Sequence, residues 1–249
     1  MIAIRALTKT VHASTGDIRL YRQFNLSVQK GSFVAIVGNN GTGKTTLLNL
    51  IAGIDTLDSG TVRIHDKPPG DVRVGYVFQN YREALYPWMS VMENITLPLR
   101  LRGVPKHKRY EIARTFCSTH GLRINFDAYP YSLSGGQQQQ ISVVRSWIDQ
   151  PDLILMDEPF SSLDYYMSFR FQKEIAQLWS EFKTTILFVS HRIDEAIYLS
   201  DRIVILGGQP VRILDDFKNP IGFPRSVNTL SSDECNRLRK RILEQLEKC

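Results

Sequence analysis

The sequence predicts an α/β fold with a parallel β-sheet at its core. Five short apolar runs have the length of buried strands, and helical segments separate most of them. These runs cover residues 33–37, 72–78, 153–156, 185–189 and 202–206. A glycine-rich loop joins the first run to an amphipathic helix, and the third run ends in two carboxylates. Open parallel sheets carry their binding sites at the carboxyl ends of strands, so both features predict a ligand site there.

Length and composition set broad limits on this prediction. With 249 residues, the chain suits one large α/β domain or two small ones. Hydrophobic residues make up 43% and charged residues 22%, which is the balance of a globular protein. The net charge of +6 suits a nucleotide, nucleic acid or an anionic membrane face, and equally a solvated surface with a basic C-terminal tail.

Two further features predict a protein of the cytosol. No apolar run approaches the roughly 18 residues of a membrane span, and the first residues lack a secretory apolar region. The three cysteines are scattered and without metal-binding spacing, so we expect free thiols at Cys117, Cys235 and Cys249.

Other segments flank the predicted core. Residues 2–7 and 18–28 are strand-rich and favour an antiparallel flank. Residues 80–140 break the alternation with turn signals and then a helix over 106–120, which indicates a mostly helical insert. The chain after residue 208 reads as loop and closes with a helix.

The closing helix has a start signal and an apolar face. Ser231 and Glu234 have the spacing of a capping box. Leu238, Ile242 and Leu246 share one face of the helix, which favours packing on its own domain over binding a partner.

The strongest local motif is GxxxxGK[ST], which follows the strand at residues 33–37 and precedes a helix. It comprises Gly38, Asn39, Asn40, Gly41, Thr42, Gly43, Lys44 and Thr45, with Thr46 next. The glycines let backbone N–H groups turn inward around phosphate oxygens at a helix N-terminus. Lys44 adds positive charge at the β- and γ-phosphates, and the Thr45 hydroxyl suits Mg²⁺. The alternative is a glycine-rich turn with an exposed lysine, which does not account for all eight matched positions.

A second motif places two carboxylates at the end of the strand over residues 153–156. Asp157 is predicted to hold Mg²⁺ through water, and Glu158 to orient or deprotonate an attacking water. Taken alone, the motif fits a surface acidic turn equally well, and the phosphate loop favours the metal site.

Further along, Leu133-Ser134-Gly135-Gly136-Gln137 reads LSGGQ, the signature of ABC ATPases. The chain resembles that family almost throughout, with its other landmarks in the family's order. These are Gln79 as the Q-loop glutamine, Ser161-Ser162-Leu163-Asp164 as the D-loop, and His191 as the switch histidine. In isolation, Gln79 reads as an ordinary polar residue and His191 as a structural histidine.

The resemblance implies an ATP hydrolase built as a P-loop NTPase. It implies a RecA-like core, an antiparallel N-terminal β flank and a helical signature subdomain. We expect one nucleotide-binding domain over residues 1–249, with the core at 1–79 and 141–249 and the helical subdomain at about 80–140.

The resemblance also assigns roles to residues, with ATP and Mg²⁺ as cofactors. Glu158, His191 and Lys44 are expected to be catalytic, and Thr45, Gln79 and Asp157 to hold the metal. The remaining nucleotide contacts are expected from Gly38 to Thr46, Gln79, His191, Ser134, Gly135, Gly136, Gln137 and Asp164.

ABC domains work in pairs, so the resemblance implies a head-to-tail dimer with a second nucleotide-binding domain, identical or homologous. The segment Leu85-Tyr86-Pro87-Trp88 resembles the importer ATPases for nitrate, sulfonate, taurine and bicarbonate. Leu85, Tyr86 and Trp88 are expected to form an exposed apolar patch where a membrane subunit docks; local packing is the alternative.

Membrane permease subunits and a solute-binding protein are therefore the expected partners, and nucleic acid is not. The chain is expected at the cytoplasmic face of the inner membrane, held there by its permease, and powering uptake of a small anion. An ABC exporter ATPase or a non-transport ABC ATPase remains an alternative. The signature and the D-loop disfavour a P-loop kinase or GTPase.

Three features of the sequence depart from the family pattern. Gln138-Gln139-Gln140 stands where the family commonly has two basic residues, although Arg145 occupies the later arginine position. The family's adenine-stacking aromatic falls near Val11 or His12, and Tyr21 lies too late. Arg192 stands where importers often have an acidic residue.

Overall fold

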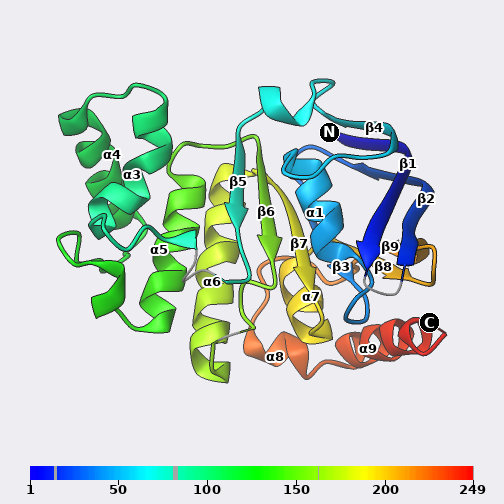
Figure 1. Ribbon diagram of the computed structural model, residues 1–249. Helices are drawn as coiled ribbons and strands as arrows, with labels where there is room; N and C mark the ends of the chain where they lie inside the picture. The colour runs from blue at the N-terminus through cyan, green and yellow to red at the C-terminus, as the bar shows by residue number, and fades with distance from the viewer. Residues whose placement is uncertain (14–15, 81–83, 162, 249) are drawn as a thin grey trace. The chain divides into compact units, whose positions relative to one another are not determined.

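The computed structural model describes residues 1–13, 16–80, 84–161 and 163–248 (Figure 1). The chain divides into two compact units. Unit 1 comprises Met1–Val72 and Thr185–Cys249, and unit 2 comprises Arg73–Thr184.

Unit 1 contains an antiparallel sheet in the order β2-β1-β4, formed by β2 (Gly16–Val28), β1 (Ile2–Ala13) and β4 (Ser59–Ile64). The predicted antiparallel flank is therefore confirmed. The sequence did not predict β4, because only Val62 and Ile64 of that strand are buried. Two apolar side chains on one face give too weak an alternation to indicate a strand.

Unit 1 also contains three parallel strands in the order β7-β3-β8: β7 (Thr185–Ser190), β3 (Phe33–Val37) and β8 (Arg202–Gly207). Every residue of these three strands is buried except Arg202, the first residue of β8. The strands therefore read as continuous apolar runs in the sequence. β9 (Arg212–Lys218) pairs with β8 in the antiparallel sense. The prediction of loop there was wrong, because only Phe217 of this edge strand is buried.

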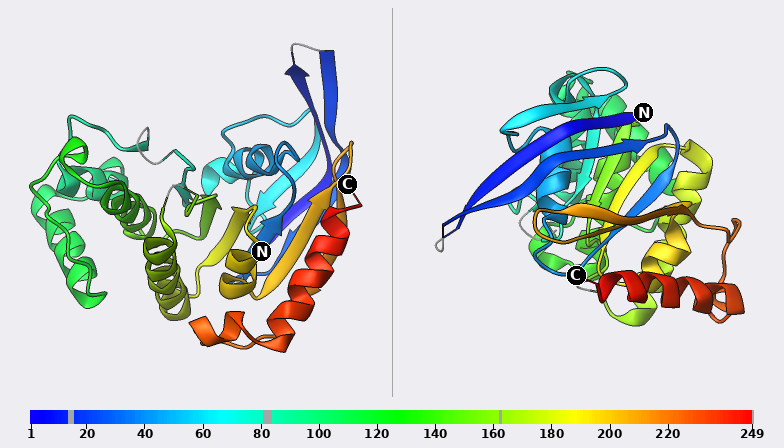
Figure 2. Two further views of the ribbon diagram at one scale, coloured as in Figure 1. Left: turned by 90° about the horizontal axis from the view of Figure 1, so that it is seen from below. Right: turned by 90° about the vertical axis from the view of Figure 1, so that its right-hand side faces the viewer.

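The helices of unit 1 are α1 (Lys44–Ala52), α7 (Ile193–Leu199), α8 (Val227–Leu230) and α9 (Asp233–Leu246). α9 runs alongside β8 and packs on α7 (Figure 2), and its apolar residues Leu238 and Ile242 are buried. This agrees with the expectation that the closing helix packs on its own domain.

The predicted cap of α9 was wrong by one residue. The hydroxyl of Ser232, not Ser231, accepts the N–H of Cys235 at 3.2 Å. Ser231 instead ends α8, where its N–H donates to the carbonyl of Asn228 at 3.2 Å. Ser231, which the capping-box spacing assigned to α9, therefore belongs to the end of the short helix α8 directly before it.

A buried arginine closes the C-terminal end of α7. Nη1 of Arg225 donates to the carbonyls of Ile197, Tyr198 and Ser200 at 2.7, 3.0 and 2.8 Å. Burial lowers the pKa of Arg225 to about 10. The last carbonyls of a helix have no intrahelical donors, so this side chain supplies what α7 itself cannot.

We expect Arg225→Met to lower the free energy of unfolding by about 2–4 kcal/mol, since it leaves several buried carbonyls without a donor. Urea denaturation followed by circular dichroism measures this change. Arg237→Met is the matched control, because Arg237 is exposed on α9. Equal stability of the two variants would show that the carbonyl contacts contribute little.

Among its described residues, unit 2 contains the parallel pair β5 (Val74–Val77) and β6 (Leu153–Asp157) together with several helices. The helices are α3 (Val91–Leu101), α4 (Lys106–Thr119), α5 (Gly135–Trp147) and α6 (Tyr165–Phe182). An apolar cluster, which includes Leu85, Ile95, Cys117 and Val144, fills the space among α3, α4 and α5. The predicted helix over 106–120 corresponds to α4.

The predicted helical subdomain, residues 80–140, falls within unit 2, which also holds β5, β6 and α6. Cys117 and Cys235 are free and buried, and Cys249 lies outside the described residues. Within the described ranges, no helix is both long enough and apolar enough to cross a membrane.

Candidate functional site

The phosphate loop leaves the end of β3 and leads into α1. Gly41 and Gly43 have φ angles of 79° and 82°, a left-handed conformation that favours glycine. A Cβ on Gly38 would lie 2.7 Å from the carbonyl oxygen of Leu206 on β8, so no side chain fits there. The tight turn that the motif predicted is therefore present, with the N-terminus of α1 at its end.

Lys44 is buried and folds back over this loop. Its Nζ donates to the carbonyl oxygens of Gly38 and Asn39, both at 2.9 Å. These two bonds hold the ammonium group at the centre of the loop, where it could contact a bound polyphosphate. The Thr42 hydroxyl donates to the carbonyl of Asn39 at 2.6 Å, while the side chain of Thr45 is exposed. Asn40 is exposed and Thr46 is half-buried.

The strand β2 contacts the phosphate loop through Tyr21. Tyr21 is fully buried, and its hydroxyl donates to the carbonyl of Gly43 at 3.0 Å. Burial raises the pKa of this phenol. Tyr21 is therefore a structural support and not a surface for a base. On β1, Val11 is half-buried and His12 is exposed. The distance from Nδ1 of His12 to Oδ1 of Asp17 is 2.5 Å. Val11 and His12 remain the candidate positions for adenine.

His191 follows β7 directly, beside the phosphate loop. In the parallel register, Ser190 of β7 pairs with Val37 of β3. The next residues, His191 and Gly38, therefore leave neighbouring strands at the same sheet edge. His191 is exposed. Unit 1 thus brings the phosphate loop and the predicted switch histidine together.

The predicted carboxylates lie in unit 2, at the end of β6. Asp157 is its last residue and is 3% exposed. Glu158 has a φ of 44°, a left-handed conformation that is strained for a residue with a side chain. Strain of this kind is typical of functional sites. Nε2 of Gln79 lies 3.5 Å from Oε2 of Glu158, so the structure brings these two predicted residues together.

The signature begins α5. The Ser134 hydroxyl accepts the N–H of Gln137 at 3.4 Å, and the Gln137 side chain accepts the N–H of Ser134 at 2.9 Å. This reciprocal cap leaves Gly135 and Gly136 in the first turn, where N–H groups have no intrahelical acceptor. The predicted helix N-terminus at LSGGQ is confirmed.

An open pocket of about 700 Å³ lies against the signature. It is lined by Ser134, Gly136 and Gln137 and also by two arginines, Arg123 and Arg170. Neither arginine was predicted to line a site, because neither belongs to a motif and they lie far apart in the chain. They bring positive charge to a pocket that contains the predicted anion-binding backbone, and Glu174, which pairs with Arg170, brings one negative charge to it.

The D-loop residue Asp164 caps α6. Its carboxylate accepts the N–H of Met167 at 2.9 Å. Leu163 lines the same pocket as the signature residues, and Ser162 lies outside the described residues. Asp164 therefore has a structural role, and its predicted contact with nucleotide stays a prediction.

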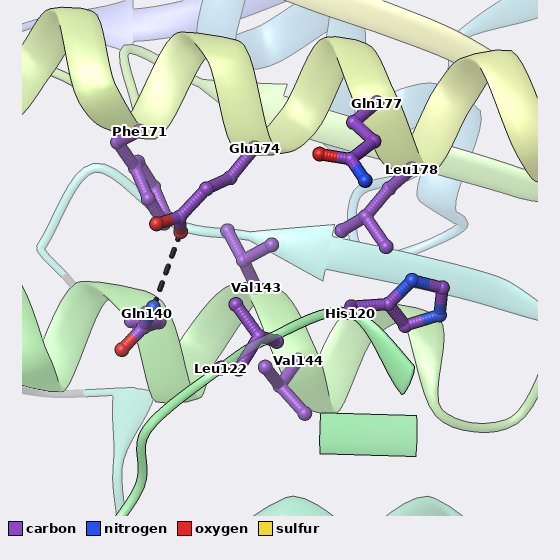
Figure 3. A pocket seen from close by; sticks show the side chains of 9 residues that line it. All are labelled: His120, Leu122, Gln140, Val143, Val144, Phe171, Glu174, Gln177 and Leu178. Carbon is purple, nitrogen blue, oxygen red and sulfur yellow. Dashed lines mark hydrogen bonds between the residues drawn. The ribbon is translucent and has the colours of Figure 1, made fainter. Parts of the chain in front are cut away.

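The glutamine run after the signature has a different contact at each position. Gln138 donates to the carbonyls of Pro130 and Leu133 at 2.9 and 3.1 Å. Gln140 points from α5 towards α6 and donates to the carboxylate of Glu174 at 3.1 Å (Figure 3). Gln139 is 1% exposed, and among the described residues neither of its amide atoms has a hydrogen-bond partner.

These contacts explain how the chain tolerates neutral residues there. Glu174 carries the negative charge that faces position 140, and Arg170 lies 3.4 Å from it. An arginine on α6 therefore balances this carboxylate. Arg145, at the later arginine position, is half-buried and donates to the carbonyl of Ala84 at 2.7 Å. Burial lowers the pKa of Arg145.

The expected apolar patch is smaller than predicted. Trp88 is 70% exposed and stacks edge-on against Tyr86, with ring centroids 5.4 Å apart. Leu85 is only 3% exposed, because it packs into the helical core of unit 2, so its assignment to the patch was wrong. The neighbouring residues Tyr81, Arg82 and Glu83 lie outside the described residues.

Comparison with known proteins identifies the relatives of this chain. The family model described as ABC transporter matches residues 21–161. An uncharacterised ABC transporter ATP-binding protein of Methanocaldococcus jannaschii is 40% identical over 99% of this chain and 91% of its own length. An aliphatic sulfonates import ATP-binding protein of Bacillus cereus is 35% identical over 99% of this chain and 96% of its own length.

Solved structures agree with these matches. The dimeric structure of a bacterial ABC transporter cassette is 29% identical, with a TM-score of 0.77, and covers 90% of this chain and 100% of the cassette. A dimeric post-hydrolysis state of a cassette bound to ADP and Pi has the same TM-score and coverage at 28% identity.

Proposed function

Since the chain belongs to the ABC transporter family and is an ATP-binding, ATP-hydrolysing subunit with the P-loop cassette fold, we propose that it powers solute uptake through partner membrane subunits. The observation that carries this proposal is the phosphate loop with Lys44 at its centre and His191 on the neighbouring strand. The named import function of the Bacillus cereus relative favours uptake of a small anion such as a sulfonate, nitrate or taurine.

In this proposal, residues of unit 1 hold the phosphates. The backbone N–H groups from Gly38 to Thr46 surround the phosphate oxygens, and Lys44 neutralises the β- and γ-phosphates. His191 contacts the γ-phosphate from the neighbouring strand. Gly38 and His191 follow the carboxyl ends of two neighbouring parallel strands, which supports this arrangement.

Residues of unit 2 act on the attacking water. Glu158 orients the water or accepts its proton. Gln79 contacts the water or the metal, and so couples the presence of the γ-phosphate to the helical part of the chain. The proximity of Gln79 to Glu158, at 3.5 Å, supports a joint role. The strained backbone at Glu158 supports a catalytic role for that residue.

Magnesium is the cation that suits the predicted donors. Thr45, Gln79 and Asp157 offer hydroxyl, amide and carboxylate oxygens, which are the ligands of a hard cation. The exposed hydroxyl of Thr45 and the buried carboxylate of Asp157 fit such a role. The metal would neutralise charge on the phosphates, which themselves supply part of its coordination.

The signature residues of this chain act on the nucleotide held by a second copy or by a homologous domain. Ser134, Gly135, Gly136 and Gln137 would contact the nucleotide held by the partner, together with Asp164. The open pocket at the signature supports binding of a ligand from outside the chain. The dimeric state of the similar cassette supports a pair of such domains.

The remaining partners are permease subunits and a solute-binding protein, which would hold the chain at the cytoplasmic face of the inner membrane. An ABC exporter is the second candidate, since some exporter ATPases are separate chains. The similarity to import proteins favours uptake.

Co-purification from detergent-solubilised membranes tests this function. We expect the chain to bring with it a multi-spanning permease and a solute-binding protein, as identified by mass spectrometry. Trp88→Ala should hydrolyse ATP at the wild-type rate but lose the permease, because Trp88 is exposed and packs edge-on against Tyr86. Leu101→Ala is the matched control, since Leu101 is also highly exposed.

The outcomes separate the candidate functions. A permease recovered without a solute-binding protein would favour export. Recovery of nucleic acid or ribosomes alone would contradict a transporter. Undiminished capture of the permease by Trp88→Ala would remove Trp88 from the interface.

A further inference from the structure

The backbone on either side of His191 is fixed by one side chain. The Ser190 hydroxyl accepts the N–H of Arg192 at 3.0 Å and so spans His191. Ser190 is the last residue of β7 and is 1% exposed. A hydroxyl that bonds the backbone two residues on forms a compact turn. His191 is the central residue of this turn.

A buried carboxylate holds this turn against α7. Oε2 of Glu195 accepts the Ser190 hydroxyl at 2.6 Å, and Oε1 accepts Nη1 of Arg192 at 3.0 Å. Glu195 is 4% exposed. Burial raises the pKa of Glu195 above its ordinary value, although the hydrogen bonds from Ser190 and Arg192 oppose this shift. A carboxylate at such a position is stable only with partners, and Arg192 supplies the opposite charge.

We propose that Arg192 and Glu195 are positioning residues that fix His191 for ATP hydrolysis. The inference rests on the proposed function, in which His191 contacts the γ-phosphate. It also gives a defined role to Arg192, which departs from the acidic residue common in importers. The guanidinium of Arg192 pairs with the carboxylate that holds the turn.

The register of the sheet explains why this geometry matters. Ser190 pairs with Val37, so the turn begins beside Gly38 of the phosphate loop. The Ser190 hydroxyl bonds the backbone after His191, so its displacement would shift the backbone that carries the imidazole. Gly38 lies close against the carbonyl of Leu206, where no side chain would fit. A misplacement of about 1 Å in a catalytic group can lower a rate roughly 100-fold.

Other contacts hold α7 in place independently of this pair. Arg225 caps the C-terminal end of the helix, and Arg239 of α9 lies 2.5 Å from Asp194 in its first turn. Loss of the pair between Arg192 and Glu195 should therefore leave α7 folded while it loosens the turn at His191.

Steady-state ATP hydrolysis by the full chain with Mg²⁺ tests the inference. We expect Arg192→Met and Glu195→Gln to lower kcat roughly 10- to 100-fold, with the KM for ATP within about twofold of wild type. Arg192→Lys should restore most of the rate, because the contact at Oε1 requires one cationic donor. Asp194→Asn is the matched control on the same helix and should hydrolyse ATP at the wild-type rate.

His191→Ala separates failure of this inference from failure of the proposed function. Full activity of Arg192→Met and Glu195→Gln beside an impaired His191→Ala would overturn the positioning role alone. Full activity of His191→Ala would overturn both. Equal losses in Asp194→Asn and Arg192→Met would show a general loosening of α7 and also overturn the inference.

Discussion

Replacement of Glu158 by Gln is expected to abolish ATP turnover while ATP still binds. The amide cannot accept a proton from the attacking water, and loss of a general base typically costs about 100- to 10,000-fold in rate. The phosphate loop lies in the other unit and keeps its own contacts. Phosphate release measures turnover, and equilibrium binding of a fluorescent ATP analogue measures affinity.

The same variant should accumulate a dimer in the presence of ATP, because nucleotide that is not hydrolysed continues to join two copies. Size-exclusion chromatography with and without ATP detects this. Glu181→Gln is the matched control in unit 2, where the half-exposed carboxylate of Glu181 lies 3.4 Å from Nδ1 of His120. Hydrolysis by Glu158→Gln at the wild-type rate would show that the catalytic carboxylate lies elsewhere.

Replacement of Lys44 by Ala is expected to abolish turnover by a different route. The ammonium group provides charge-assisted bonds to phosphate, each worth about 1.5–3 kcal/mol, so ATP should bind roughly 10- to 100-fold more weakly. Lys44 also donates to the carbonyls of Gly38 and Asn39, so its loss should loosen the loop itself.

Isothermal titration with ATP and a phosphate-release assay together check this result. Lys30→Ala serves as the control, because Lys30 is exposed on unit 1 and lies outside the loop. Unchanged turnover in Lys44→Ala would remove this lysine from the site. Comparison of Lys44→Ala with Glu158→Gln distinguishes a defect in ATP binding from a defect in the hydrolysis step.

The central strands that the sequence predicted correctly in unit 1 share one physical property. β3, β7 and β8 are buried on both faces, so their residues are nearly all apolar and the pattern is visible without a structure. β4 and β9 bury one or two side chains each, and their edge positions tolerate polar residues. Leu85 was misplaced because an apolar residue beside Tyr86 and Trp88 carries no local sign of burial.

The sequence by itself determined the chemistry of the phosphate loop, the carboxylate strand and the signature. Each is a contiguous motif, in which neighbouring residues are held together by the backbone. The tertiary structure alone decided which distant residues meet, such as Gln140 with Glu174, Arg123 and Arg170 in one pocket, and Arg225 with α7. These contacts depend on how helices pack, and packing brings together side chains whose spacing in the chain follows no fixed period.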